Sequence, residues 1–170
     1  MKKVLALLVA LCLMLPVMAM AEDTITIGQV QYAAHGTRCF AVLTVAMQGD
    51  VIVAAHIDEY QFMDATTAVG VPNSEDAFGE SFPEGMVLAS KLANNETYSA
   101  SMADHAGSTV SLADNYAAIE AFVVGKTISE LEGEVAEKDA AAMVDAVSGA
   151  TLVDTLGYIN GLIEAAKAAQ

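Results

Sequence analysis

The sequence predicts one α+β domain, in which a small antiparallel sheet packs against helices and the chain ends in a helix. Two apolar, β-branched runs at 39–47 and 51–60 flank a glycine-bearing turn, which is typical of a β-hairpin. The second half of the chain instead repeats its apolar residues at helical spacing, with capping residues before several of the runs. No internal repeat or linker divides the 170 residues, so a single domain is the simplest architecture.

Extended structure is expected in the first third of the chain. Residues 24–32 alternate enough between apolar and polar side chains to predict a first strand. The hairpin follows, with its two strands joined at Gln48-Gly49-Asp50. Residues 64–83 contain glycines, prolines and polar turn residues, so they predict a long irregular loop, and loops of that length are often functional.

The middle of the chain predicts helices. Residues 86–107 predict one or two short helices that end at Gly107, since glycine suits the left-handed conformation that follows a helix. Residues 111–124 predict a well-marked helix. Ser111 and Asp114 cap its first turn, and an apolar stripe follows at helical spacing.

Further helices are expected towards the C-terminus. A short helix should begin at Thr127 and be interrupted by Gly133, and residues 140–144 suit either a helix or an extended segment. The last helix should begin at Thr151, with Asp154 three residues further on as its capping partner. Its apolar stripe consists of Leu152, Leu156, Ile159 and Ile163, and an alanine-rich end extends it.

Residues 1–21 have the features of a signal peptide. Two lysines precede an apolar stretch, and Ala19-Met20-Ala21 matches an A-x-A cleavage site. Cleavage before Glu22 would leave 149 of the 170 residues, secreted or at the cell surface. Cys12 lies inside the apolar stretch, which argues against a lipid anchor. The alternative is a signal that is retained as a tether.

The expected mature chain is strongly acidic. The full sequence has a formal net charge of −15, and loss of its two N-terminal lysines leaves five bases against 22 acids, or −17. This balance excludes a basic nucleic-acid footprint and argues against direct binding to anionic membranes. It also disfavours holding a free anionic nucleotide by electrostatics alone. Cys39 is the sole cysteine of the mature chain, which excludes an internal disulfide and cysteine-ligated clusters.

The most specific feature of the sequence is the run Asp145-Ala146-Val147-Ser148-Gly149-Ala150-Thr151. Gly149 and Ala150 are small enough for the backbone or phosphate of another molecule to come close, and Gly149 can adopt a positive φ. A helix that begins at Thr151 would present unpaired N–H groups and a partial positive charge, which suit a phosphodiester. The plain alternative is an ordinary helix-capping threonine after a turn.

This D-x-x-S-G-A-T run resembles the flavinylation motif of the FMN-binding domain family. The family includes flavin-carrying subunits of sodium-pumping quinone reductases and ferredoxin-oxidising complexes, and small extracytoplasmic flavoproteins. The resemblance implies that a dedicated transferase, which uses FAD, esterifies FMN through its phosphate to the hydroxyl of Thr151. Asp145, Ser148 and Gly149 would belong to the recognition loop, and Ala150 would border the cofactor. Outside the motif the resemblance rests mainly on the paired-strand pattern.

The resemblance implies an exported flavoprotein that relays electrons outside the cytoplasm and receives them from a membrane-bound donor. It favours a redox carrier over a stand-alone catalyst. Tyr158 would lie about two turns beyond Thr151 on the same helical face, where it could flank the isoalloxazine ring or simply pack in the core. The alternative function is a secreted sensory or ligand-binding module on the same fold, with the motif unused.

Other chemistry has weaker support. His35, His56 and His105 could form a metal site with neighbouring acids, but no spacing matches a zinc signature, so no metal site is expected. The sequence also lacks the motifs of serine hydrolases, P-loop enzymes and dinucleotide-binding dehydrogenases.

Overall fold

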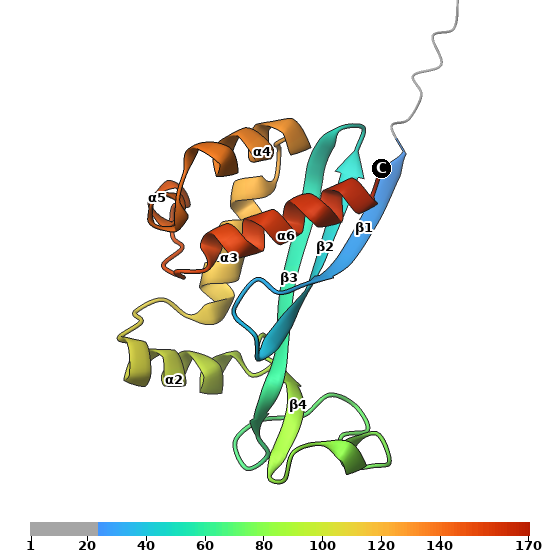
Figure 1. The fold of residues 1–170 in the computed structure, drawn as a ribbon, viewed down its shortest axis with the longest axis vertical. Coiled ribbons are helices and arrows are strands. Elements are labelled where there is room, and N and C mark those ends of the chain that lie inside the picture. Colours follow the sequence, from blue (N-terminus) through green and yellow to red (C-terminus); the bar gives the residue numbers. More distant parts are fainter. Residues whose placement is uncertain (1–23) are drawn as a thin grey trace, which may run out of the picture.

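The protein folds as an α+β arrangement of a four-stranded antiparallel sheet and helices, as the sequence predicted (Figure 1). The computed structural model describes residues 24–170, so the predicted signal peptide at 1–21 lies outside the described residues. The sheet order is β1-β2-β3-β4, and each strand pairs antiparallel with its sequence neighbour. Within residues 24–170, no helix combines the length and apolarity needed to cross a membrane.

The sheet contains the predicted hairpin and one strand that the sequence did not predict. Its strands are β1 (Ile25–Tyr32), β2 (Cys39–Gln48), β3 (Val51–Asp64) and β4 (Met86–Ser90). Gly49 turns the β2–β3 hairpin with a φ of 62°. The expectation of a helix at the start of 86–107 was wrong, because β4 pairs with the far end of β3. An apolar run of four residues, such as 86–89, does not reveal by its periodicity whether it forms a strand or a buried helix.

The helices follow the predicted order, with one correction inside α4. They are α2 (Asn95–Ala106), α3 (Leu112–Val123), α4 (Ile128–Glu137), α5 (Ala140–Ala146) and α6 (Thr155–Ala168). Gly107 ends α2 in the left-handed conformation, Ser111 caps α3, and Thr127 with Glu130 forms a capping box on α4. Gly133 does not interrupt α4, because the buried Leu131 anchors the helix and the exposed glycine is tolerated.

The last helix begins four residues later than predicted. Asp154 is the residue before the first turn of α6, its side chain makes no capping hydrogen bond, and Thr151 lies in a non-helical segment. The physical reason is a long-range contact: the backbone N–H of Thr151 donates to the side-chain oxygen of Asn115 on α3, at 2.6 Å. This contact holds Thr151 outside the helix, so tertiary structure overrides the local capping signal.

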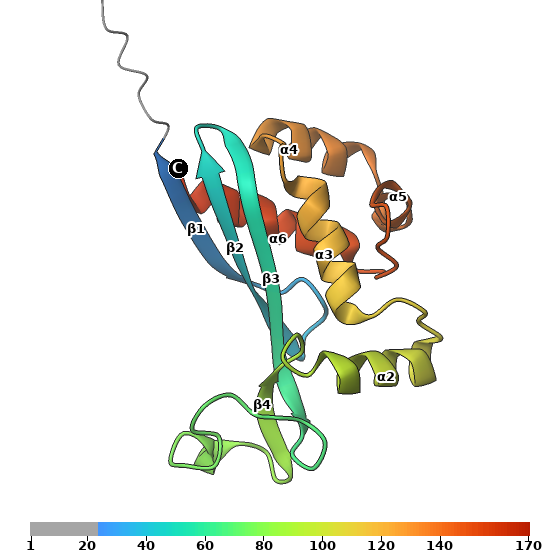
Figure 2. The ribbon, with the colours of Figure 1, turned by 180° about the vertical axis from the view of Figure 1, so that it is seen from behind.

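Between β3 and β4 the chain forms the predicted long irregular loop, which contains a single turn of 3₁₀ helix, η1 (Gly79–Ser81). The loop and the ends of β3 and β4 extend away from helices α3 to α6 (Figures 1 and 2). Phe82 packs edge-to-face against both Phe62 and Phe78 and closes the loop on the strand.

Helix α6 packs directly on the sheet through residues without large side chains. It crosses β1 and β2 (Figures 1 and 2). Gly157, Gly161 and Ala165 recur at one-turn spacing along the helix. A methyl group at Gly161 would lie 2.1 Å from Leu43 Cδ1, and one at Gly28 of β1 would lie 1.9 Å from the carbonyl oxygen of Ala165. The helix and sheet backbones are therefore too close for a side chain at either glycine.

Substituting Gly28 with alanine should destabilise the fold, because the new methyl group must displace the backbone of α6. We expect Gly28→Ala to lower the free energy of unfolding by about 1–3 kcal/mol or more. The matched control is Gly133→Ala in α4, where nothing lies within 4 Å and where we expect a gain of about 1 kcal/mol. Urea denaturation followed by circular dichroism measures both. Equal stabilities for the two variants would contradict the close packing.

Candidate functional site

The Asp145–Thr151 run forms the end of α5 and a tight turn. Asp145 lies exposed in the last turn of α5, rather than in a loop. The turn is closed by a 3.0 Å hydrogen bond from the Ala150 N–H to the Val147 carbonyl, and Gly149 has a φ of 95°, as its place in the motif predicted. Ser148 and Gly149 are exposed, so part of the turn is open to another macromolecule.

Thr151 follows the turn with an exposed side chain that Asn115 holds. Its hydroxyl donates to Asn115 Oδ1 at 3.2 Å, and its backbone N–H donates to the same oxygen at 2.6 Å. Asn115 is fully buried in α3, and its own amide donates to the Ser111 carbonyl at 2.9 Å. The position of the threonine is thus fixed by a side chain 36 residues away in sequence.

Thr151 lies on the wall of a cavity of about 360 Å³. The rest of the wall includes Lys91, which follows β4, and residues of α2, α3 and α6. Apolar and aromatic side chains are prominent in it, including Tyr98, Met102, Leu112 and Tyr158. The structure therefore brings together Thr151 and Tyr158, two of the predicted site residues. Their proximity does not come from a shared helical face, because Thr151 precedes α6. The other motif residues, Asp145, Ser148, Gly149 and Ala150, do not line the cavity.

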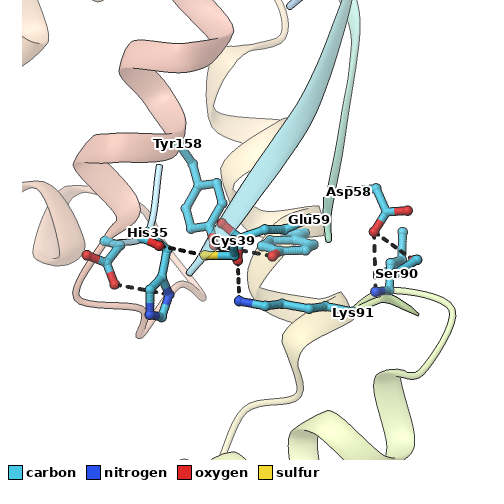
Figure 3. Close-up of polar contacts among 10 residues, drawn as sticks. His35, Cys39, Asp58, Glu59, Ser90, Lys91 and Tyr158 are labelled. Carbon is cyan, nitrogen blue, oxygen red and sulfur yellow. Dashed lines mark hydrogen bonds and ion pairs between the residues drawn. The ribbon is translucent and has the colours of Figure 1, made fainter. Parts of the chain in front are cut away.

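A buried ion pair lies beside this cavity (Figure 3). The ammonium of Lys91, which follows β4, donates to Glu59 Oε2 of β3, and the two side chains are 1% and 0% exposed. The same carboxylate oxygen accepts from the Tyr158 hydroxyl at 3.0 Å, and the Tyr116 hydroxyl lies 3.2 Å from that of Tyr158. Lys91 lines the cavity and Glu59 does not.

Burial and pairing together determine the charges of this cluster. Burial lowers the pKa of the Lys91 ammonium, but its interactions with Glu59 and Tyr98 outweigh the effect of burial, so the net pKa is raised and Lys91 stays protonated. Burial also raises the pKa of Tyr158, with the nearby Tyr116 and Glu59 adding to the rise, so its hydroxyl remains a donor. The floor of the cavity thus carries a paired cation and a neutral phenol.

The mouth of the cavity carries a second, weaker pair. His35 Nδ1 lies 3.4 Å from Asp154 Oδ2, and both side chains are partly exposed. The Cys39 thiol donates to the His35 carbonyl at 2.6 Å. Burial raises the pKa of this thiol to about 11, and the positive charge of Lys91 offsets the rise only in part.

The three histidines that could have formed a metal site lie apart. His56 lies 3.4 Å from Glu120, and His105 bonds within α2 to the Ser101 carbonyl at 2.9 Å. Across residues 24–170, no group of three or more histidine, cysteine or acidic side chains is arranged to hold a metal ion.

Sequence reasoning missed Asn115, Lys91 and Glu59. A signal for Glu59 was present, since it shares strand alternation with the buried Ile57 and so places a carboxylate on the apolar face of β3. A buried carboxylate requires a partner, and the mature chain offers only five bases, so the candidates for that partner were few. For Asn115 the sequence holds no comparable signal.

Comparison of the chain with protein-family models, with curated protein sequences and with solved structures finds no match.

The raised pKa of Cys39 predicts slow alkylation. A thiol with a pKa of about 11 in place of 9.0 has about a hundredfold less thiolate near neutral pH, and the thiolate is the reactive form. In a chain that starts at Glu22, iodoacetamide at pH 8 should therefore label Cys39 slowly in the folded protein and much faster in denaturant. Intact mass against time measures the rate, with Cys39→Ser as the blank. Similar rates in the folded and denatured protein would show that the thiol is not shielded.

Proposed function

We propose that the protein is an exported flavoprotein that carries FMN as a phosphoester on Thr151 and relays electrons outside the cytoplasm. The observation that supports it most is the position of Thr151. Its exposed hydroxyl lies on the wall of a largely apolar cavity and directly follows a turn that fits the flavinylation motif. A tethered group at this residue therefore has both an attachment point and a cavity next to it.

The residues present fit an attached FMN. The cavity volume of about 360 Å³ falls in the range of small-molecule sites, roughly 300–1,000 Å³. Tyr98, Met102 and Tyr158 would bury the apolar parts of the ring, and the protonated Lys91 would face its polar edge. FMN supplies the electron transfer, while the chain supplies attachment, burial and tuning.

Attachment requires a partner enzyme, because the Thr151 hydroxyl donates to the amide oxygen of Asn115, which cannot act as a general base. We propose a flavin transferase that uses FAD. The Thr151 oxygen bonds to the FMN phosphorus, and the bond from that phosphorus to the bridging oxygen breaks. AMP leaves with the bridging oxygen and takes up the proton of the hydroxyl. Asp145 is exposed and well placed for contact with such an enzyme. A covalent bond also retains an anionic nucleotide on a chain of charge −17, where electrostatic attraction would not.

The oxidised carrier would accept electrons from a membrane-bound donor, and the reduced carrier would pass them to an acceptor outside the cytoplasm. The alternative, a secreted sensory or ligand-binding module, draws on the same cavity, since a cation among aromatic side chains also suits a small organic anion. The absorption spectrum of the denatured protein separates the two. A flavin chromophore that survives denaturation indicates the carrier, and a colourless chain indicates the binding module.

Removing the Thr151 hydroxyl should abolish flavin attachment. After coexpression with a flavin transferase, the wild-type chain should gain one FMN-sized mass, and Thr151→Val should gain none because no nucleophilic oxygen remains. Thr109→Val is the matched control, since Thr109 is exposed and lines the same cavity, and we expect it to load normally. An adduct that persists in Thr151→Val would place the flavin elsewhere.

Replacing Asp145 should block attachment without unfolding the protein. Its carboxylate is exposed and could help the transferase's metal or orient the acceptor, but it would repel the product phosphate. We therefore expect Asp145→Ala to load less than a tenth of the wild-type flavin, with an unchanged circular dichroism spectrum. Glu137→Ala, an exposed acid at the end of α4, should load fully. Normal loading of Asp145→Ala would contradict this role.

A further inference from the structure

We propose that Lys91 and Glu59 form a charge pair that sets the reduction potential of the flavin, with the Lys91 ammonium on the cavity side favouring the reduced, anionic ring. The inference rests on the proposed function and goes beyond it, because it assigns the tuning of the cofactor to two named residues. The two residues of the pair are placed differently: Lys91 lines the cavity, whereas Glu59 does not line it and contacts the Lys91 ammonium.

The backbone fixes the position of both residues. The Lys91 N–H donates to the Glu59 carbonyl at 2.7 Å, directly after the paired segment of β3 and β4. Tyr158 holds the carboxylate from the side of α6. The ammonium is therefore held by Glu59 on β3 and lies over the ring of Tyr98 on α2, and it cannot leave the cavity wall without losing both contacts.

The ammonium retains the capacity to bind an acceptor. It has three N–H donors; one is used by Glu59, and the charge lies 4.7 Å from the centre of the Tyr98 ring. Its carbon stem and nitrogen are almost fully buried, so water screens the charge little. A buried cation on the wall of a largely apolar cavity favours ligands that carry, or gain, negative charge there.

Reduction of a flavin creates such a charge. Two electrons from a reductant and one proton convert the oxidised ring into a reduced ring with one negative charge, which Lys91 would stabilise and Glu59 would oppose. Although the pair is neutral as a whole, Lys91 is the member at the cavity wall, so its contribution is the larger. The reduced state should therefore be favoured by Lys91 and disfavoured by Glu59.

The test is the reduction potential of the covalently loaded protein, measured by equilibration with reference dyes during dithionite titration. We expect Lys91→Met to lower the two-electron reduction equilibrium roughly tenfold, or ~30 mV, and Glu59→Gln to raise it by a smaller factor. The double variant Lys91→Met/Glu59→Gln should fall between wild type and Lys91→Met. Lys138→Met, which removes a surface cation paired with Glu134, should match wild type.

The double variant and Glu59→Gln keep the test valid if Lys91→Met does not fold, because Lys91→Met alone leaves a buried carboxylate unpaired. A merely structural pair would change the urea stability of these variants and leave their potentials equal, and equal potentials would overturn the inference alone. A wild-type chain that carries no covalent flavin after coexpression with the transferase would overturn the proposed function and the inference together.

Discussion

The close approach of α6 to β1 and β2 is the constraint on which the rest of the structure depends. It is possible because glycine lies on both sides of the contact, at Gly28 on the sheet and at Gly161 on the helix. The approach brings the Tyr158 hydroxyl within 3.0 Å of Glu59 on β3, a residue 99 positions away in sequence. The segment between α5 and α6 leads into the N-terminal end of α6. There it lines the cavity together with residues of α2 and α3. The packing of small residues thus determines the location of the site.

The buried pair of Lys91 and Glu59 is unusual for a chain with so few bases. Burying two charges costs desolvation that their attraction and hydrogen bonds offset only in good geometry, so such a pair is weak evidence for stability. An apolar pair of similar volume would pack as well. Paired charges with shifted pKa values cluster at functional sites, and the position of Lys91 on the wall of the cavity agrees with that tendency.

The sequence predicted features that depend on neighbouring residues and missed those that depend on distant ones. The Gly49 turn, the Ser111 cap and the Thr127–Glu130 capping box are local, and all three were predicted correctly. Strand β4 was missed because its identity comes from pairing with β3. The candidate site shows the same division: Thr151 and Tyr158, which the motif and its spacing singled out, both line the cavity. Asn115 was not, because its importance arises from a contact that only the folded chain makes.

Because α6 begins at Thr155 and not at Thr151 as predicted, the Thr151 hydroxyl does not cap the helix, which affects its chemistry. A threonine that caps a helix uses its side-chain oxygen to accept a backbone N–H, which occupies a lone pair. In the structure the hydroxyl instead donates its hydrogen to Asn115 Oδ1, at 3.2 Å, and the helix begins at Thr155. Donation leaves the oxygen lone pairs free to form a bond and increases the electron density on that oxygen. The hydroxyl of the non-capping threonine is therefore a better nucleophile than that of a capping one would be, and Asn115 makes the difference because it holds Thr151 outside the helix.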